Sequence, residues 1–158
     1  MYKLVETKED IRKISKMAGN IWHEAYKDMI SLDQIDYMLD KFLSIKAIKE
    51  QINEHYDYFI LRGEKPAGFA AILHKDNEVF ISKLYVYKDD RGKGLTTLFI
   101  DYTKSFKKPM YLTVNKTNLK AVKLYERLGF KITESVVSDI GSGYVMDDYV
   151  LRYEHDNL

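Results

Sequence analysis

The spacing of apolar residues predicts a first third that is helical after one short strand. The strand covers residues 2–6, and Thr7 is placed as the N-cap of the helix that follows. Gly19 and Asn20 are expected to interrupt this helix. Ser31 and Gln34 have the S-x-x-Q spacing of a capping box, which predicts a second helix. Ser44 is expected to cap a third helix.

The middle of the chain changes to the pattern of extended strands. Residues 57–62, 67–73 and 78–87 are rich in β-branched, aromatic and other apolar side chains. Short polar turns containing glycine, proline, aspartate and asparagine separate them. Three strands joined by short turns predict an antiparallel meander.

The last third alternates strands and helices. A helix over residues 94–105 is followed by a strand over 110–114, which predicts a parallel crossover to the strand before the helix. A second helix begins at Asn118 and ends at Gly129. Two more strands, 131–138 and 144–153, flank a loop at 139–143 that is expected to be flexible. The pattern predicts a mixed α/β fold with a mostly antiparallel sheet of about six to seven strands flanked by helices.

Composition narrows the class of protein. With 158 residues, 46% of them hydrophobic, the chain is expected to form one domain, 1–158, with a full core. A net charge of +1 argues against binding of nucleic acid or of a membrane surface. The absence of cysteine excludes disulfides and thiol nucleophiles. Without an apolar leader or a membrane-spanning run, a cytoplasmic protein is expected. The four histidines show no metal-binding spacing, and no metal is expected.

A basic, glycine-containing turn lies between the third strand of the meander and the helix that follows it. Its residues are Arg91, Gly92, Lys93 and Gly94. The first amides of a helix have no internal partner, and the helix dipole is positive there, so such a turn suits a phosphate or pyrophosphate. A tight turn with solvated basic residues is the alternative. The spacing matches neither a Walker A loop nor G-x-G-x-x-G.

Two stretches of the sequence resemble the GNAT N-acetyltransferases. The first, residues 91–96, follows the family's acetyl-CoA loop Q/R-x-x-G-x-G/A except at its last position, where Thr96 replaces a glycine or alanine. The second, residues 118–130, matches the family's later helix N-x-x-A-x-x-x-Y-x-x-x-G-F completely. The order of the predicted elements is also similar to the GNAT acyl-CoA N-acyltransferase fold. The branch that acetylates diamines and polyamines is a candidate.

The resemblance implies acetyl-CoA as the cofactor, bound where two parallel strands separate. It implies that the strand backbone at Leu84, Tyr85 and Val86 binds the pantetheine arm as an added strand would. It also implies that Asn118 contacts the cofactor. The pyrophosphate would be held by the loop and the first helical turn, whose residues are Arg91, Gly92, Lys93, Gly94, Leu95, Thr96 and Thr97.

The resemblance implies a catalytic role for Tyr125. A phenol with a pKa near 10 can donate a proton to a leaving thiolate. Its spacing alone, on the apolar face with Ala121 and Val122, favours a core aromatic residue. The strand over 110–114 offers no side chain that could accept a proton from the amine. His23, Glu24 and Asp147 therefore remain candidates for the general base.

Carboxylates with aromatic residues suit a cationic acceptor amine. Trp22, His23, Glu24, Tyr26 and Asp147 are the candidate acceptor residues, although Trp22 and Tyr26 are equally candidates for the core. The expected function is transfer of an acetyl group to a primary amine of a small cationic molecule such as a polyamine. The alternatives are acetylation of a protein or peptide N-terminus or lysine, and a non-catalytic acyl-CoA-binding module. A homodimer is compatible with the family.

Overall fold

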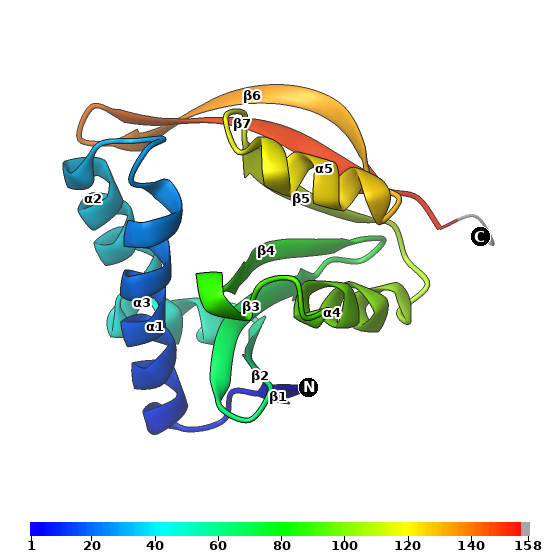
Figure 1. The fold of residues 1–158 in the computed structure, drawn as a ribbon, viewed down its shortest axis with the longest axis horizontal. Coiled ribbons are helices and arrows are strands. Elements are labelled where there is room, and N and C mark those ends of the chain that lie inside the picture. The colour runs from blue at the N-terminus through cyan, green and yellow to red at the C-terminus, as the bar shows by residue number, and fades with distance from the viewer. Residues whose placement is uncertain (156–158) are drawn as a thin grey trace.

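The computed structural model of the chain describes residues 1–155. Seven strands form one sheet in the order β1-β2-β3-β4-β5-β7-β6. The elements are β1 (Tyr2–Leu4), α1 (Lys8–Tyr26), α2 (Leu32–Leu43), α3 (Ile45–Asn53), β2 (Tyr56–Arg62), β3 (Pro66–His74), β4 (Val79–Val86), the 3-10 turn η1 (Lys88–Asp90), α4 (Leu95–Lys104), β5 (Met110–Asn115), α5 (Leu119–Arg127), β6 (Lys131–Gly141) and β7 (Tyr144–Tyr153). Figure 1 shows their arrangement. The predicted mixed α/β fold is confirmed.

The sheet separates two apolar cores. The helices of the first third of the chain, α1, α2 and α3, pack against one core, and α4 and α5 pack against the other. Alternating residues of the meander serve both cores, with Tyr58 and Ile60 in the first and Phe59 and Leu61 in the second. None of the helices in residues 1–155 combines the length and apolar character that a membrane span needs.

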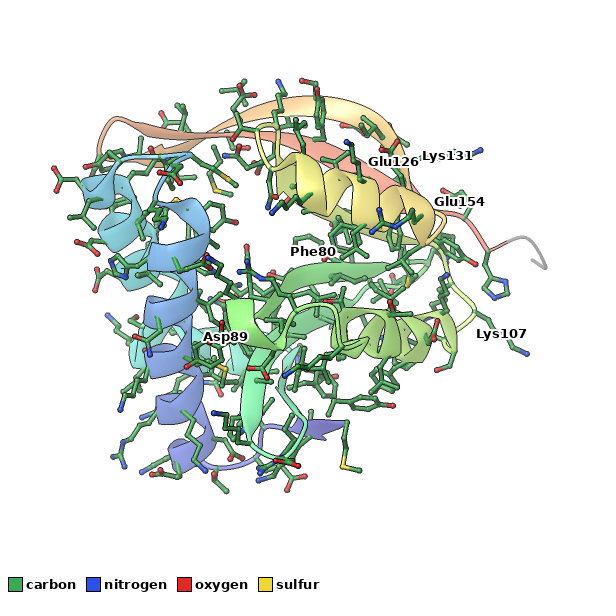
Figure 2. All side chains as sticks on the ribbon, in the orientation of Figure 1. Phe80, Asp89, Lys107, Glu126, Lys131 and Glu154 are labelled. Carbon is green, nitrogen blue, oxygen red and sulfur yellow. The ribbon has the colours of Figure 1, made fainter. Side chains whose placement is uncertain are left out.

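All neighbouring strands are antiparallel except β4 and β5. This parallel pair matches the predicted crossover through α4. Only two residue pairs are in register, Val79 with Met110 and Phe80 with Tyr111. Figure 2 labels Phe80. On its other side β4 pairs with β3, where Ser82 is an extra residue that shifts the register. Such a bulge bends a strand, and β4 and β5 separate beyond this point (Figure 1).

The prediction that Gly19 and Asn20 interrupt the first helix is wrong, because α1 runs unbroken from Lys8 to Tyr26. A glycine inside a helix costs about 1 kcal/mol relative to alanine. The apolar face that continues through Ala18, Ile21 and Trp22 is buried, which outweighs this cost. The predicted N-cap is confirmed, since the Thr7 side chain accepts a hydrogen bond from the Asp10 amide at 3.1 Å.

The predicted loop at residues 139–143 is shorter in the structure. Strand β6 continues to Gly141, and only Ser142 and Gly143 form the turn of a hairpin. The carbonyl of Ile140 accepts hydrogen bonds from the Tyr37 hydroxyl, at 2.7 Å, and from the Lys41 ammonium. The β6–β7 hairpin therefore extends across to α2, as Figure 1 shows, and is held there by side chains that turn-forming residues alone do not reveal.

A single glycine keeps β3 close to the part of β4 that lies beside the opening. A Cβ built on Gly68 would collide with the backbone carbonyl of Tyr85. We predict that Gly68→Ala lowers the free energy of unfolding by about 1–3 kcal/mol, because β4 must shift to admit the methyl group. Chemical denaturation measures this change. Gly63→Ala is the matched control, since nothing lies within 4 Å of the Cβ at that position. Equal stability losses in the two variants would contradict the close approach at Gly68.

Candidate functional site

The separation of β4 and β5 creates the opening around which the candidate site is built. Beyond Phe80 and Tyr111 the two strands share no register, although β4 continues to Val86 and β5 to Asn115. Backbone amides and carbonyls of the two strands that face one another across this opening have no strand partner there. Unpaired edges of this kind can bind an extended ligand as an added strand. Leu84, Tyr85 and Val86 lie on this part of β4, as the resemblance implies.

The turn after β4 presents backbone amides at the start of α4. Gly92 and Gly94 have left-handed φ values of 78° and 83°, which favour glycine. Gly94 is the N-cap, so α4 begins one residue later than predicted. The Leu98 amide bonds to the Gly94 carbonyl at 2.9 Å, whereas no hydrogen bond within residues 1–155 uses the amides of Leu95, Thr96 or Thr97. Unpaired amides at a helix start suit an anion.

The two basic residues of the turn are held by acidic neighbours. The guanidinium of Arg91 donates to the Val86 carbonyl at 3.2 Å and to the Glu24 carboxylate at 3.0 Å. Lys93 pairs with Asp90 at 3.4 Å. Glu24, a candidate acceptor residue from the sequence, therefore lies against the turn and joins it to α1.

Three aromatic side chains pack between α1 and β4. The hydroxyls of Tyr26 and Tyr85 are 2.9 Å apart, and Trp22 makes edge contacts with both rings at 5.5 Å and 5.4 Å. Burial raises the pKa of Tyr26 to about 12, partly offset by the hydrogen bond with Tyr85. Both phenols therefore stay protonated at neutral pH. The indole N–H of Trp22 is buried and has no hydrogen-bond partner within residues 1–155.

Tyr125 lies on α5, on the other side of the opening. Its side chain is buried, with the ring packed edge-on against Phe130 at 5.7 Å. Burial raises the pKa of Tyr125, and the neighbouring Tyr26 raises it further. Tyr125 also raises the pKa of Tyr85. The three phenols are thus close enough to influence one another across the opening, and Tyr125 remains a proton donor.

Asn118 stands at the first turn of the same helix. Its side chain accepts a hydrogen bond from the Ala121 amide at 3.3 Å and so caps α5. The side-chain nitrogen of Asn118, Nδ2, is not used by this cap. The residue can therefore serve as a helix cap and still donate to a bound ligand.

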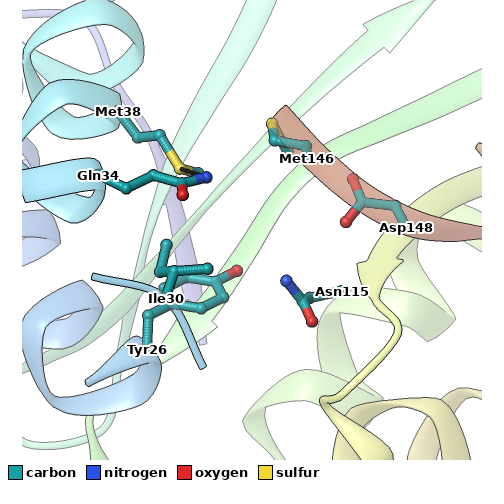
Figure 3. A pocket seen from close by; sticks show the side chains of 7 residues that line it. All are labelled: Tyr26, Ile30, Gln34, Met38, Asn115, Met146 and Asp148. Atoms are coloured by element: carbon teal, nitrogen blue, oxygen red, sulfur yellow. Dashed lines mark hydrogen bonds between the residues drawn. The ribbon is translucent and has the colours of Figure 1, made fainter. Parts of the chain in front are cut away.

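A pocket lies between α2 and the β5–β7 edge of the opening. Its lining residues are Tyr26, Ile30, Gln34, Met38, Asn115, Met146 and Asp148. Figure 3 shows the Asp148 carboxylate, the Asn115 amide and the Tyr26 hydroxyl pointing toward the same space. Asp148 is 8% exposed. Burial, with Asp147 second, raises the pKa of Asp148 to about 6, while Lys116 lowers it.

Asp148 lines the pocket, although the sequence favoured its neighbour Asp147 as the candidate acceptor residue. Its neighbour Asp147 is more exposed and pairs with Lys116 at 2.6 Å, outside the pocket. Strand alternation was the available signal, because Met146 and Asp148 share one face of β7 and Asp147 lies on the other. Alternation does not separate a buried from an exposed face here, because both faces of β7 carry apolar residues.

His23 connects α1 to α2 rather than lining the pocket. Its Nδ1 is 2.7 Å from the Gly19 carbonyl, and its Nε2 is 2.7 Å from the Asp36 carboxylate. These two acceptors, the Gly19 carbonyl foremost, raise the pKa of His23. Among residues 1–155 no group of three or more histidine, aspartate and glutamate side chains is arranged to hold a metal ion.

The sequence of the chain is similar to that of known proteins. The model of the acetyltransferase (GNAT) domain matches residues 26–146. The peptidyl-lysine N-acetyltransferase YjaB of Escherichia coli is 25% identical over 125 residues, 77% of each chain. YjaB of Salmonella typhimurium is 28% identical over 82 residues, 51% of this chain, and the match spans about half (54%) of that relative.

The fold also matches solved structures. The PaiA N-acetyltransferase of Thermoplasma acidophilum, solved in complex with coenzyme A, superposes with a TM-score of 0.76. The match covers 98% of this chain and 99% of that one, at 16% sequence identity. At this identity the likeness concerns the fold.

The raised pKa of Asp148 predicts a pH-dependent effect on stability. The folded carboxyl keeps its proton to about pH 6, whereas an unfolded aspartic acid loses it near pH 3.8. Folding is therefore penalised at pH values above 6, and the penalty disappears as the pH falls below about 4. We predict that Asp148→Asn raises the thermal midpoint at pH 8 by about 2–6 °C and has little effect at pH 4.

Thermal unfolding followed by circular dichroism at both pH values measures this difference. The control is Asp147→Asn, which removes the adjacent, exposed carboxylate. An Asp148→Asn midpoint shift that is the same at both pH values would argue against a buried, proton-retaining carboxyl.

Proposed function

The chain belongs to the GNAT family of acetyl-CoA-dependent N-acetyltransferases, and on this premise we propose that it transfers the acetyl group to a primary amine by direct attack in a ternary complex. The observation that carries the proposal is the position of Tyr125. Its phenol is buried on α5, the helix that follows β5, and lies close enough to Tyr26 for the two phenols to influence each other. A protonated phenol at this place can donate to a leaving thiolate.

The residues around the opening fit coenzyme A. An added Cβ at Gly92 or Gly94 would meet no atom within 4 Å, so the outer face of the turn has room for a pyrophosphate. The amides of Leu95, Thr96 and Thr97 would bind it, and the Thr96 hydroxyl can add a donor where the family has a smaller residue. When bound, the cofactor supplies the acetyl group as a thioester.

The remaining residues position the cofactor and its arm. The backbone at Leu84, Tyr85 and Val86 would bind the pantetheine arm, and Asn118 would contact it from α5. Arg91 holds the turn through its bonds to Val86 and Glu24, which keeps the phosphate-binding amides in register with β4.

Two acceptor classes are candidates. Carboxylates and aromatic side chains near α1 and β7 favour a small cationic amine such as a polyamine. The similarity to YjaB, a peptidyl-lysine N-acetyltransferase, favours a lysine side chain. Both classes present a primary ammonium. Thiol release from acetyl-CoA, measured with spermidine, putrescine and a lysine-containing peptide, separates them.

We predict that Tyr125→Phe lowers kcat by about 10²-fold or more, because the thiolate loses its proton donor, while the dissociation constant of coenzyme A changes little. Thiol release gives kcat, and calorimetry gives the dissociation constant. Tyr153→Phe is the matched control, since Tyr153 also packs against Phe130, at 5.6 Å, but lies outside the opening. Unchanged turnover in Tyr125→Phe would remove the proposed role.

A protein that binds coenzyme A but releases no thiol with any amine would instead be an acyl-CoA-binding module. That result would contradict the transferase assignment and leave the cofactor assignment standing.

A further inference from the structure

The pocket beside the opening has a single acidic group. Ile30, Met38 and Met146 give it an apolar wall, and Gln34 and Asn115 contribute neutral amides. The side-chain amide of Gln34 donates to the Val145 carbonyl at 2.7 Å, so this donor is occupied. Of the predicted capping box, only the bond from the Gln34 backbone amide to the Ser31 hydroxyl is formed. The cavity volume of the pocket is about 20 Å³, which is room for one group of about the size of a water molecule or an ammonium, and the pocket is open to solvent. Its chemistry is that of a small pocket with an apolar wall, neutral polar groups and one carboxylate.

That carboxylate has no counter-charge. Within residues 1–155, no hydrogen bond or ion pair includes the side chain of Asp148, and the residue is 8% exposed. The nearest cation, Lys116, is paired with Asp147 at 2.6 Å. A buried carboxylate is costly unless it is paired and hydrogen-bonded. The pocket therefore lacks a positive charge beside this carboxylate, and a cationic ligand can supply one.

The other titratable groups near Asp148 do not supply that charge. Asp148 raises the pKa of Tyr26 on α1 and of Tyr85 on β4, and burial keeps both phenols neutral. From β7 itself Asp147 adds negative charge, and Lys116 opposes it from the turn after β5. A ligand cation placed against Asp148 would meet only neutral or negative groups within the pocket.

Asp148 lies on β7 in the wall of the pocket, and Tyr125 lies on α5. Tyr26 is influenced by the charge of Asp148 and in turn affects Tyr125, while Tyr85 is influenced by both. A reaction centre between β4 and β5 would thus have a proton acceptor on the pocket side and a proton donor on the α5 side.

We infer that this pocket receives the acceptor as a primary ammonium at the end of an unbranched, uncharged alkyl chain, and that Asp148 binds the ammonium and accepts its proton. The inference rests on the proposed transferase function. The methionines suit the chain because their side chains are unbranched and adaptable. A second charge within a few carbons of the first would lie against Met38 and Met146 and be desolvated without a partner.

The proton balance of the step is complete. Asp148 takes one proton from the ammonium, and the free amine attacks the carbonyl carbon of the thioester. The new C–N bond forms, the C–S bond breaks, and the thiolate receives a proton from Tyr125. The second proton of the amine nitrogen restores the phenol, and Asp148 returns its proton to water. The products are the N-alkyl acetamide and coenzyme A.

The role of Asp148 is tested by the pH dependence of kcat/KM for n-butylamine in Asp148→Asn and in the wild type. We expect a deficit of at least about 100-fold near pH 7. Without its base the variant uses only free amine, whose fraction rises tenfold per pH unit below the amine pKa near 10. The deficit should therefore shrink by about tenfold per unit between pH 7 and pH 9.

Two further variants complete this experiment. Asp148→Glu should recover part of the activity, because it restores a carboxylate. Glu134→Gln removes an exposed carboxylate on β6 and should match the wild type at every pH. A deficit that stays constant with pH would show a structural role, and no deficit would show no role. Either result overturns the inference.

The class of acceptor is tested with the wild type and a series of amines. From ethylamine to n-butylamine, kcat/KM should rise by about fourfold per methylene. 1,3-Diaminopropane should be at least about tenfold poorer than n-propylamine, because its second ammonium is desolvated. Equal or better turnover of the diamine, or thiol release with branched and aromatic amines without preference for chain length, would overturn this class. Thiol release with no amine at all would instead overturn the proposed transferase function.

Discussion

The parallel pairing of β4 and β5 stops after two residue pairs, and the candidate site depends on that early end. A longer ladder would satisfy the backbone groups of both strands and close the sheet. Here the bulge at Ser82 bends β4 away, and each strand leads into a helix whose start faces the same opening. The amides before α4 and the cap residue Asn118 before α5 are thereby brought to one ligand. The phenol of Tyr125 is carried on the second of these helices.

The other side of the opening is built from the two ends of the chain. Helix α1 is fixed to β4 and its turn by the Tyr26–Tyr85 hydrogen bond and the Arg91–Glu24 ion pair. Helix α2 is fixed to the β6–β7 hairpin by Gln34 and Tyr37. These contacts place a buried carboxylate from β7 opposite residues of α1 and α2. The acceptor side of the opening therefore depends on contacts between elements that are far apart in the sequence. The cofactor side depends largely on residues that are close together in the sequence.

This difference explains how much the sequence could predict. The meander, the N-caps at Thr7 and Ser44, and the turn at residues 91–94 were predicted because each follows from neighbouring residues. The continuity of α1 through Gly19 was missed, because burial of the helix face outweighs the local preference.

The site shows the same division. Tyr125 was found through a motif that lies within one helix and its cap. Asp148 was not separated from Asp147, because only the pairing of β7 with β5 and the packing against α2 decide which carboxylate is buried. The ordered hairpin tip at Ile140 was missed for a similar reason, since its hydrogen-bond partners are about 100 residues away in the sequence.

The most direct measurement of the central claim is a crystal structure of the chain with coenzyme A. We expect the pyrophosphate on the amides of Leu95 to Thr97 and the pantetheine arm between β4 and β5. We also expect the sulfur within about 3.5 Å of the Tyr125 hydroxyl. Coenzyme A bound outside this opening, or a sulfur far from the phenol, would contradict this arrangement.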